Sequence, residues 1–429
     1  MTFFILTFGC KVNQCESENI EKSMEKNGFE VCDDFEKADI VILNSCAVTA
    51  ESVRKLRQSI HKIKHTNPNS ILTVTGCVAQ AESDEISKMP EVDIVIGNAN
   101  KGDIPTIIKK YLQNKKSILK VGPIFNLKSF PNEIVNYSPH RSRAFLKIED
   151  GCNRFCSYCI IPYARGRVRS KNLSDIGSDV KILAKNGYKE VVLVGINLSS
   201  YGMDTDKNLA DAVEVVCSVD GIERVRLSSL EPDLMTDEIL LRLSKEPKLC
   251  HQFHLALQSG SNKILSSMRR RYTREEYIEV VNKIKNMFPN ATFTTDLMVG
   301  FPGENEEDFR DSLDLIGEVG FLKVHVFPYS VRPGTLAENF DGQIPKSIKT
   351  KRVHEVMEKS AETCRKVLES SVDKTCEVLY ETLDKDGFYE GYTKEYIPVK
   401  TRSNKDLRGK IVPTNMGDIK DNYILCDYI

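Results

Sequence analysis

The chain has 429 residues, a length that suggests about three domains. Hydrophobic residues make up 41% of it, and together with glycine this apolar share is typical of soluble globular proteins and excludes intrinsic disorder for most of the chain. Lysine and arginine (60) nearly balance aspartate and glutamate (61), giving a formal net charge of -1. Overall charge therefore gives no reason to expect nucleic-acid binding, and any such contact must come from local patches.

The chain contains no window close to the ~18 uninterrupted apolar residues that a membrane helix requires. The apolar opening from Phe3 to Phe8 lacks both a preceding basic segment and a following small-residue cleavage site. We therefore expect a cytosolic protein with no membrane partner, and a monomer. Its 13 cysteines are too few for a disulfide scaffold and, in a reducing compartment, favour metal ligands or core residues.

Residues 1–115 alternate short apolar runs with amphipathic stretches of helix length. The runs predicted as strands are Phe3–Phe8, Ile40–Asn44, Ile71–Thr75 and Asp93–Ile96. This alternation predicts an α/β domain with an open, mainly parallel sheet. Prolines at 123, 131 and 139 then interrupt all periodicity, so a linker is predicted at 116–140.

A more regular alternation occupies residues 141–370. The predicted strands are Phe145–Ile148, Val191–Val194, Arg224–Leu227, Phe253–Leu257, Phe293–Leu297 and Lys323–Phe327. Six βα units in succession predict a partial (βα)6 barrel, followed after Pro345 by a charged helix to about Ser370. Residues 371–429, rich in β-branched and aromatic residues with glycines at turns, predict a small all-β domain.

Three cysteines, Cys152, Cys156 and Cys159, are spaced C-x3-C-x2-C directly after the first predicted barrel strand. Three thiolates on one loop can hold three corners of a [4Fe–4S] cluster and leave the fourth iron open to a small molecule. The alternatives are a zinc knuckle that lacks its fourth ligand, or three chance cysteines, and His140 has no zinc-ligand spacing to the group. The cluster is favoured because the loop follows the carboxyl end of a barrel strand, the face where such barrels carry out chemistry.

This loop resembles the signature of the radical S-adenosylmethionine enzymes, with an aromatic residue, Tyr158, before the third cysteine. The resemblance implies that the open iron chelates S-adenosylmethionine and that reduction by an electron donor cleaves it to a 5′-deoxyadenosyl radical, while the protein positions the reactants.

Polar and small residues follow the next three barrel strands, where loops would surround a bound cofactor. We expect S-adenosylmethionine to be bound by Gly195, Asn197, Ser228, Ser229, Glu231 and Gln258. Each could instead be a turn or helix-cap residue, but their recurrence at the same end of successive strands favours binding.

The amino-terminal domain carries a second set of cysteines, Cys10, Cys46 and Cys77, each at the end of a predicted strand. In an open parallel sheet the carboxyl ends of strands line one crevice, so distant cysteines can converge there. A single one of them would be interpreted as a buried structural cysteine. Three at equivalent positions, two of them preceded by Gly9 and Gly76, predict ligands of a second [4Fe–4S] cluster with one open iron.

The remaining cysteines show no such arrangement and are expected to be core or surface residues. They are Cys15, Cys32, Cys217, Cys250, Cys364, Cys376 and Cys426.

Taken together, these domains resemble the methylthiotransferase family over essentially the whole chain, and the last domain resembles a TRAM domain, an RNA-binding β-barrel. Three runs are most similar to the tRNA threonylcarbamoyladenosine branch: GCKVNQ at Gly9–Gln14, RAFLKIEDGCNRFCSYCIIPYARG at Arg143–Gly166 and HVFPYSVRPGT at His325–Thr335. Cys15 stands where an aromatic residue is expected, and we exclude it as a ligand because it falls in a helical pattern beyond the strand end.

The resemblance implies conversion of N6-threonylcarbamoyladenosine, at position 37 beside the anticodon of tRNA, to its 2-methylthio form. One S-adenosylmethionine would methylate a sulfur held at the amino-terminal cluster, and a second would supply the radical that activates C2–H of the adenine. An aromatic C–H has no useful acidity, so general base catalysis could not remove its proton at neutral pH.

Contact with the anticodon stem-loop needs local positive charge. Three basic segments are predicted to supply it, namely Arg165, Arg167, Arg169 and Lys171; Arg269, Arg270, Arg271 and Arg274; and Lys400, Arg402, Lys405, Arg408 and Lys410. Each could equally be ordinary solvated surface.

Two other functions remain open. A sister methylthiotransferase would act on isopentenyladenosine in tRNA or on an aspartate of a ribosomal protein, with the same six cysteines. A non-catalytic Fe–S protein that binds RNA or carries electrons belongs to a different class, and the open iron argues against it because electron carriers normally ligate all four corners.

Overall fold

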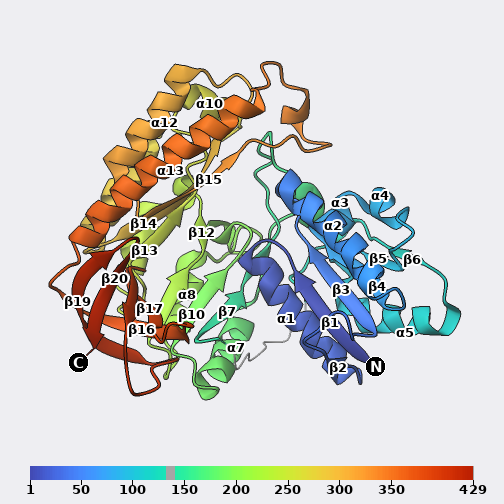
Figure 1. Cartoon of the computed structure of the whole chain (residues 1–429). Coiled ribbons are helices and arrows are strands. Elements are labelled where there is room, and N and C mark those ends of the chain that lie inside the picture. The colour runs from blue at the N-terminus through green and yellow to red at the C-terminus, as the bar shows by residue number, and fades with distance from the viewer. Residues whose placement is uncertain (132–140, 429) are drawn as a thin grey trace. The chain divides into compact units, whose positions relative to one another are not determined.

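The structure is a computed structural model that describes residues 1–131 and 141–428. The chain forms two compact units (Figure 1). The first contains the described amino-terminal stretch together with Glu149–Ser170 and Ser330–Glu338. The second contains residues 141–148, Lys171–Tyr329 and the described residues from Asn339 onward. The loop that carries Cys152, Cys156 and Cys159 therefore belongs to the same unit as Cys10, Cys46 and Cys77.

The first unit is built on a six-stranded parallel sheet of order β2-β1-β3-β4-β5-β6. Its strands are β1 (Thr2–Thr7), β2 (Glu30–Val31), β3 (Ile40–Ser45), β4 (Ile71–Gly76), β5 (Ile94–Ile96) and β6 (Ile118–Lys120). The four strands predicted from sequence are confirmed. The start of the predicted linker is corrected, because β6 pairs with β5 inside it, and 132–140 of that linker lie outside the described residues.

Alternation along the buried strands gives this sheet two apolar faces. Ile40 and Ile42 face a core shared with α1 and α5, while Val41 and Leu43 face a core shared with α2, α3 and α4. The helices are α1 (Lys11–Lys26), α2 (Ala50–Thr66), α3 (Cys77–Ala81), α4 (Ser83–Ser87) and α5 (Ile104–Asn114), with short 3-10 turns at Asn98–Asp103 and Ile124–Asn126.

The cysteine loop of residues 149–170 packs on the second of these cores. Its base is closed by β8 (Glu149–Asp150) and β9 (Arg169–Ser170), which pair antiparallel. Helix α6 (Ile161–Arg165) follows the cysteines, and its Ala164 is fully buried in the same core as Cys77 and Val78 of α3.

The second unit carries the predicted barrel strands, and its α/β class with parallel sheets is confirmed. They form two parallel sheets of order β11-β10-β7 and β12-β13-β14-β15, joined at a bridge between Val225 and Leu249. The strands are β7 (Arg143–Lys147), β10 (Glu190–Val194), β11 (Arg224–Leu227), β12 (Ser229–Leu230), β13 (Gln252–Leu255), β14 (Thr292–Val299) and β15 (Lys323–Pro328).

Helices between these strands begin at strong capping signals. Asn208 with Asp211, Thr273 with Glu276 and Asn305 with Asp308 form reciprocal capping boxes. The helices are α7 (Leu173–Lys185), α8 (Leu209–Cys217), α9 (Asp237–Leu243), α10 (Asn262–Ser267), α11 (Arg274–Met287) and α12 (Glu306–Val319), with 3-10 turns at Leu198–Ser200, Pro232–Leu234 and Leu336–Asn339.

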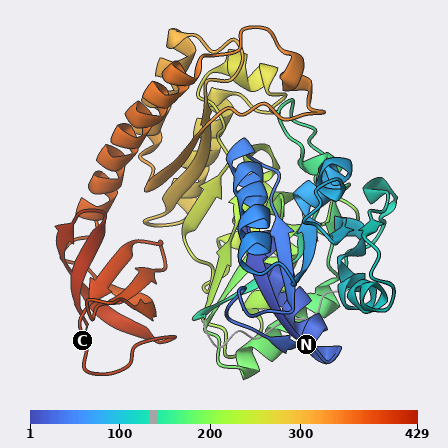
Figure 2. The same cartoon turned by 45° about the vertical axis from the view of Figure 1, so that its right-hand side comes forward.

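The chain ends in the predicted long helix, α13 (Lys346–Glu369), and a closed five-stranded barrel, as Figure 2 shows. The barrel strands are β16 (Thr375–Leu383), β17 (Tyr389–Thr393), β18 (Pro398–Thr401), β19 (Ile411–Lys420) and β20 (Tyr423–Tyr428). Within the second unit, Arg226 donates to the carbonyl of Thr393 (3.3 Å) and Arg224 donates to that of Glu377 (2.7 Å), which fixes this barrel to β11. Among residues 1–131 and 141–428, none of the helices combines the length and apolar character needed to span a bilayer.

Candidate active site

Cys10, Cys46 and Cys77 converge at one edge of the first sheet. Cys10 caps α1 just beyond β1, Cys46 directly follows β3, and Cys77 is the first residue of α3 after β4. Because β1, β3 and β4 are parallel neighbours, their carboxyl ends deliver all three thiols to the same place. Burial raises the pKa of Cys46 to about 12, with further contributions from the nearby Cys77 and Cys10.

Two glycines permit this close approach. Gly9 and Gly76 both have φ of +95°, a conformation that side chains other than that of glycine rarely adopt. A Cβ on Gly9 would lie 2.5 Å from the Cβ and 2.7 Å from the Sγ of Cys46. A Cβ on Gly76 would lie 2.4 Å from the carbonyl oxygen of Ser45.

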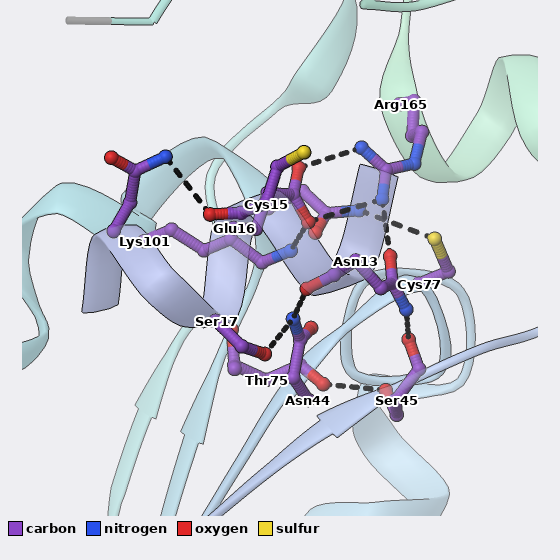
Figure 3. A network of polar contacts seen from close by, with 12 residues as sticks. Asn13, Cys15, Glu16, Ser17, Asn44, Ser45, Thr75, Cys77, Lys101 and Arg165 are labelled. Atoms are coloured by element: carbon purple, nitrogen blue, oxygen red, sulfur yellow. Dashed lines mark hydrogen bonds and ion pairs between the residues drawn. The ribbon is translucent and has the colours of Figure 1, made fainter. Parts of the chain in front are cut away.

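A polar network beneath the thiols holds the three turns together (Figure 3). Asn13 donates to the carbonyls of Phe8 (2.7 Å) and Ser45 (3.0 Å), and so ties α1 to the turns after β1 and β3. Asn44 donates to the carbonyl of Asn13 (2.9 Å), and Ser45 donates to that of Thr75 (2.5 Å). Two of these bonds join the turn of Cys10 to that of Cys46, and one joins the turns of Cys46 and Cys77, so the network links all three.

Arg165 connects this site to the second cysteine loop. Its guanidinium is 1% exposed and donates to Glu16 at 2.7 and 3.1 Å and to the side-chain oxygen of Asn13 at 2.6 Å (Figure 3). Burial acts to lower its pKa, but Cys77, Glu16 and Asp150 raise it well above the usual value. Arg165 is therefore a permanent buried cation beside Cys77.

The loop of Cys152, Cys156 and Cys159 is held at both ends. Cys152 donates its N–H to the carbonyl of Gly166 (3.0 Å), and Cys159 donates to that of Cys156 (3.0 Å). Gly151 (φ +94°) is required here, since a Cβ on it would lie 2.0 Å from the carbonyl oxygen of Arg167. Cys152 and Cys156 are buried and Cys159 is half-buried, so the loop presents one thiol nearer the solvent.

Within the described residues, no three His, Cys, Asp or Glu side chains surround a single metal ion. This finding is compatible with two cysteine trios, because a cubane is held by one thiolate on each of several irons. Cys15 lies inside α1, as predicted, and not at the strand end.

The residues expected to bind S-adenosylmethionine lie in the second unit, after strands β10, β11 and β13. Ser228 and Gln258 are each 8% exposed, and the Ser228 hydroxyl and the Gln258 Oε1 find no hydrogen-bond partner among the described residues. Asn197 and Glu231 stand at the N-cap positions of the 3-10 turns that follow them, and neither side chain makes a capping hydrogen bond. Glu231 forms an ion pair with Arg270, and its backbone N–H donates to Ser199 Oγ (2.6 Å).

A group of polar side chains on β13, β14 and β15 was not predicted from the sequence. It lies on the face of these strands opposite to the helices. Phe253 packs against Phe288 and Phe293, so the residues of opposite parity on these strands, His254 and Asp296, face the other way. His254 Nε2 lies 3.4 Å from the Asp296 carboxylate, and the His325 ring centroid is 5.9 Å from that of His254. The signal was the period-two pattern, in which polar residues occupy one face of otherwise apolar strands.

The predicted basic segments need correction. Arg165, Arg169 and Lys171 are buried, and each is engaged by an acidic side chain, which leaves Arg167 as the exposed member of that segment. They are buried because their positive charge serves internal ion pairs with Glu16, Asp150 and Asp179.

The other two segments are corrected in part. Arg270 is paired with Glu231, whereas Arg269 and Arg271 are exposed. Lys400 lies between Asp384 (3.0 Å) and Glu390 (2.6 Å), and Arg408 pairs with Asp406 (2.7 Å).

Comparison with known proteins agrees with this geometry. Residues 146–316 match the radical SAM superfamily, and residues 2–97 match an uncharacterized protein family, UPF0004. Among solved structures, the radical S-adenosylmethionine methyltransferase TsrM from Kitasatospora setae aligns with a TM-score of 0.60 and 13% identity over 79% of this chain and 77% of that one, a likeness of fold alone.

Curated relatives match over almost the full length. Threonylcarbamoyladenosine tRNA methylthiotransferase MtaB of Aquifex aeolicus is 39% identical, with 95% of this chain and 98% of the relative covered. The MtaB protein of Bacillus subtilis is 36% identical, covering 95% and 91%. The tRNA-2-methylthio-N(6)-dimethylallyladenosine synthase of Clostridium botulinum (strain Loch Maree) is 38% identical, covering 98% and 95%. The chain therefore belongs to the family of radical SAM methylthiotransferases, enzymes that use S-adenosylmethionine and two [4Fe–4S] clusters.

Proposed function

We propose that this enzyme converts N6-threonylcarbamoyladenosine at position 37 of tRNA to its 2-methylthio derivative. The observation that carries the methylthio transfer is the presence of two separate cysteine trios in one compact unit, one on a loop and one assembled from three strand ends. A methylthio transfer needs both a site that holds sulfur and a site that generates a radical. Two trios, each leaving one iron open, match that requirement.

Each trio is assigned as the ligand set of one [4Fe–4S] cluster. Cys152, Cys156 and Cys159 hold the cluster that binds S-adenosylmethionine, and Cys10, Cys46 and Cys77 hold the auxiliary cluster. Gly9 and Gly76 supply the cradle that a Cβ would fill. When bound, the clusters and S-adenosylmethionine supply radical chemistry that can activate an aromatic C–H.

The protein's own residues prepare both sites. The buried guanidinium of Arg165 offsets the negative charge that three thiolates would concentrate near Cys77. Asn98 donates its amide N–H toward Cys77 Sγ (3.8 Å) and to the carbonyl of Ala164 (2.7 Å), which orients that thiol relative to α6. In the second unit, the buried Ser228 hydroxyl and Gln258 Oε1 await polar partners that the S-adenosylmethionine would provide. An external electron donor must reduce the radical site.

RNA contact is supported by an exposed aromatic group on and beside the loop of residues 149–170, here called the radical loop. Phe125 and Tyr163 are 45% and 41% exposed, and Phe155, directly before Cys156, stacks near Phe125 with ring centroids 6.5 Å apart. Arg167 lies over the Phe155 ring at 5.1 Å. Splayed RNA bases are bound by stacking on aromatic rings and guanidinium planes, so this group fits an unpaired base of the anticodon loop.

The modification on the adenosine is the finer part of the proposal. Relatives named for threonylcarbamoyladenosine and for dimethylallyladenosine match at similar identity, so the assignment rests on the three runs at Gly9–Gln14, Arg143–Gly166 and His325–Thr335. The second candidate is the dimethylallyladenosine substrate. Its prenyl group is apolar, whereas the threonylcarbamoyl group carries a carboxylate and a urea.

The test is turnover of two matched tRNAs. Reconstituted enzyme, S-adenosylmethionine, sulfide and a reductant are incubated with tRNA that carries either threonylcarbamoyladenosine or isopentenyladenosine in the same loop. Nucleoside mass spectrometry should show the methylthio product from the first tRNA alone, because polar groups that satisfy a carboxylate and urea are left unpaired against a prenyl group. Comparable turnover of the prenylated tRNA would establish the second candidate instead.

A further inference from the structure

Arg332 is a buried arginine that forms no ion pair among the described residues. It is 5% exposed, and its Nε and Nη2 find no hydrogen-bond acceptor among the described residues. Only its carbonyl oxygen is used, as an acceptor from the N–H (3.2 Å) and hydroxyl (2.8 Å) of Thr335. A buried charge that is left unpaired is costly, so a side chain held in this state is expected to meet an anion that binds to it.

The segment that carries Arg332 reaches both cysteine sites of the first unit. At one end, the Ser330 hydroxyl accepts from the N–H of Ala50, which begins the helix after Cys46 (3.1 Å). At the other end, the N–H of Ala337 donates to the carbonyl of Ser157, inside the radical loop (2.8 Å). Arg332 therefore lies in a segment, residues 330–337, that is hydrogen-bonded at one end near Cys46 and at the other end within the loop of Cys152, Cys156 and Cys159.

Two titratable groups lie close enough to Arg332 to act on its charge. Burial lowers its pKa, and the two groups that oppose this shift are Glu82 and Cys46. Glu82 already has a cation, Arg57, at 3.7 Å. Cys46, the other group close enough to act on Arg332, belongs to the auxiliary trio, and the bond between Ser330 and Ala50 anchors the segment beside the same trio.

Resting on the proposed function, we propose that Arg332 is a positioning residue that pairs with the anionic sulfur group handled at the Cys10, Cys46 and Cys77 site. A guanidinium has several N–H donors in a rigid plane, and its hydrogen bonds to anions are stronger than neutral ones. Such bonds keep the sulfur anionic and fix its direction. Arg165 cannot fill this role because Glu16, Asp150 and Asn13 already occupy both of its terminal nitrogens, whereas Nη2 of Arg332 has no acceptor among the described residues.

The test measures sulfide binding to the full-length, anaerobically reconstituted protein, with no tRNA present. Arg332→Gln and Arg332→Lys are compared with Arg54→Gln, which removes an exposed arginine of the same unit that pairs only with Glu51 on the surface. Sodium sulfide and methanethiolate are titrated while the cluster absorption and electron paramagnetic resonance signals are followed. Iron is quantified in each sample, so that cluster loss is distinguished from loss of binding.

We expect Arg332→Gln to keep its iron and to bind sulfide about 10- to 100-fold more weakly, the equivalent of losing one hydrogen bond to a charged group. Arg332→Lys should retain part of the affinity, and Arg54→Gln should match the wild type. If Arg332→Gln loses iron, the sulfide affinity of Arg332→Lys is compared with that of the wild type instead.

Three outcomes would overturn the inference. Unchanged sulfide affinity in an iron-replete Arg332→Gln variant would leave Arg332 with no role toward sulfur. A Gln variant that loses tRNA affinity while binding sulfide normally would assign Arg332 to an RNA phosphate. Wild-type protein that holds both clusters and binds no sulfide would overturn the proposed function along with this inference.

Discussion

Gly9 sets how close the turn after β1 can come to Cys46. Replacement by alanine would force a Cβ to within 2.5 Å of the Cβ of the buried Cys46, and this collision is relieved only if one of the two cysteine-bearing turns moves. Gly28 offers a matched control, because it has a similar φ of +88° with no atom within 4 Å of its would-be Cβ. The two substitutions therefore share the backbone strain and differ in the collision.

We expect Gly28→Ala to cost about 1–2 kcal/mol of stability, the cost of the left-handed conformation, and to keep full iron. Gly9→Ala should be more destabilising and should lose the auxiliary iron. Thermal unfolding and iron analysis of the reconstituted proteins measure both effects. Equal behaviour of the two variants would show that the approach of Gly9 to Cys46 is immaterial to the site.

The six cysteines give the most direct prediction at this scale. Two four-iron cubanes amount to about 8 iron per chain. Replacing Cys152, Cys156 and Cys159 by alanine should leave about half of this iron and abolish reductive cleavage of S-adenosylmethionine. Replacing Cys10, Cys46 and Cys77 should also halve the iron, while cleavage survives. A second triple variant with full iron content contradicts the auxiliary assignment.

At the scale of elements, the radical loop behaves as part of the first domain. Helix α6 contributes Ala164 to the core that contains α3, and Arg165 to the network around Asn13 and Glu16. The same loop holds Phe155 at φ +51°, a conformation that is unusual for a bulky residue. Strain of this kind persists where the surroundings over-determine it and often marks a binding site.

The aromatic group beside this loop should bind an RNA base. Changing Phe125 and Tyr163 to alanine should weaken tRNA binding by about 10- to 100-fold, since stacking contributes about 1–3 kcal/mol per base. Tyr163→Phe keeps the ring and should bind as the wild type does. The measurement is fluorescence anisotropy with labelled anticodon stem-loop RNA.

Leu119→Ala serves as the control for exposed apolar surface, because Leu119 is 49% exposed in the same unit. A loss of affinity in this variant as large as that of the aromatic pair would refute base stacking as the cause.

At the scale of the whole molecule, RNA binding depends on exposed basic residues that form no ion pair among the described residues. In the carboxyl-terminal barrel, Arg402, Lys405 and Lys410 are exposed, whereas Lys400 is clamped between Asp384 and Glu390. Changing those three to glutamine should weaken tRNA binding and flatten the plot of log affinity against log salt. Each lost phosphate contact lowers the slope by about 0.9 on duplex or about 0.7 on single strands.

Lys400→Gln removes one positive charge from the same barrel. The slope of log affinity against log salt should stay that of the wild type in this variant. Binding is measured from low to moderate salt after iron content has been checked. An unchanged slope in the triple variant would assign the tRNA contact to Arg167, Arg269 and Arg271, the exposed members of the other two segments.

The order of strands and helices could be predicted from the sequence, because apolar periodicity is a local property. The four amino-terminal strands, the six barrel strands, α13 and the closing β-barrel all form where the pattern indicated. Strand β6 was missed because it is a short edge strand, with Ile118 half-buried and Leu119 exposed, so it lacks an apolar run.

The two cysteine trios could also be found from the sequence, since one is a spaced motif and the other recurs at strand ends. What the tertiary structure decided is the partner of each charge. A run of arginines predicts a basic patch, yet Arg165 and Arg169 are buried against Glu16 and Asp150. Arg332, a single arginine that no charge pattern marks, is buried and forms no ion pair among the described residues. Periodicity and spacing are written along the chain, but whether a charge is neutralised depends on residues far away in sequence, and only the fold brings those together.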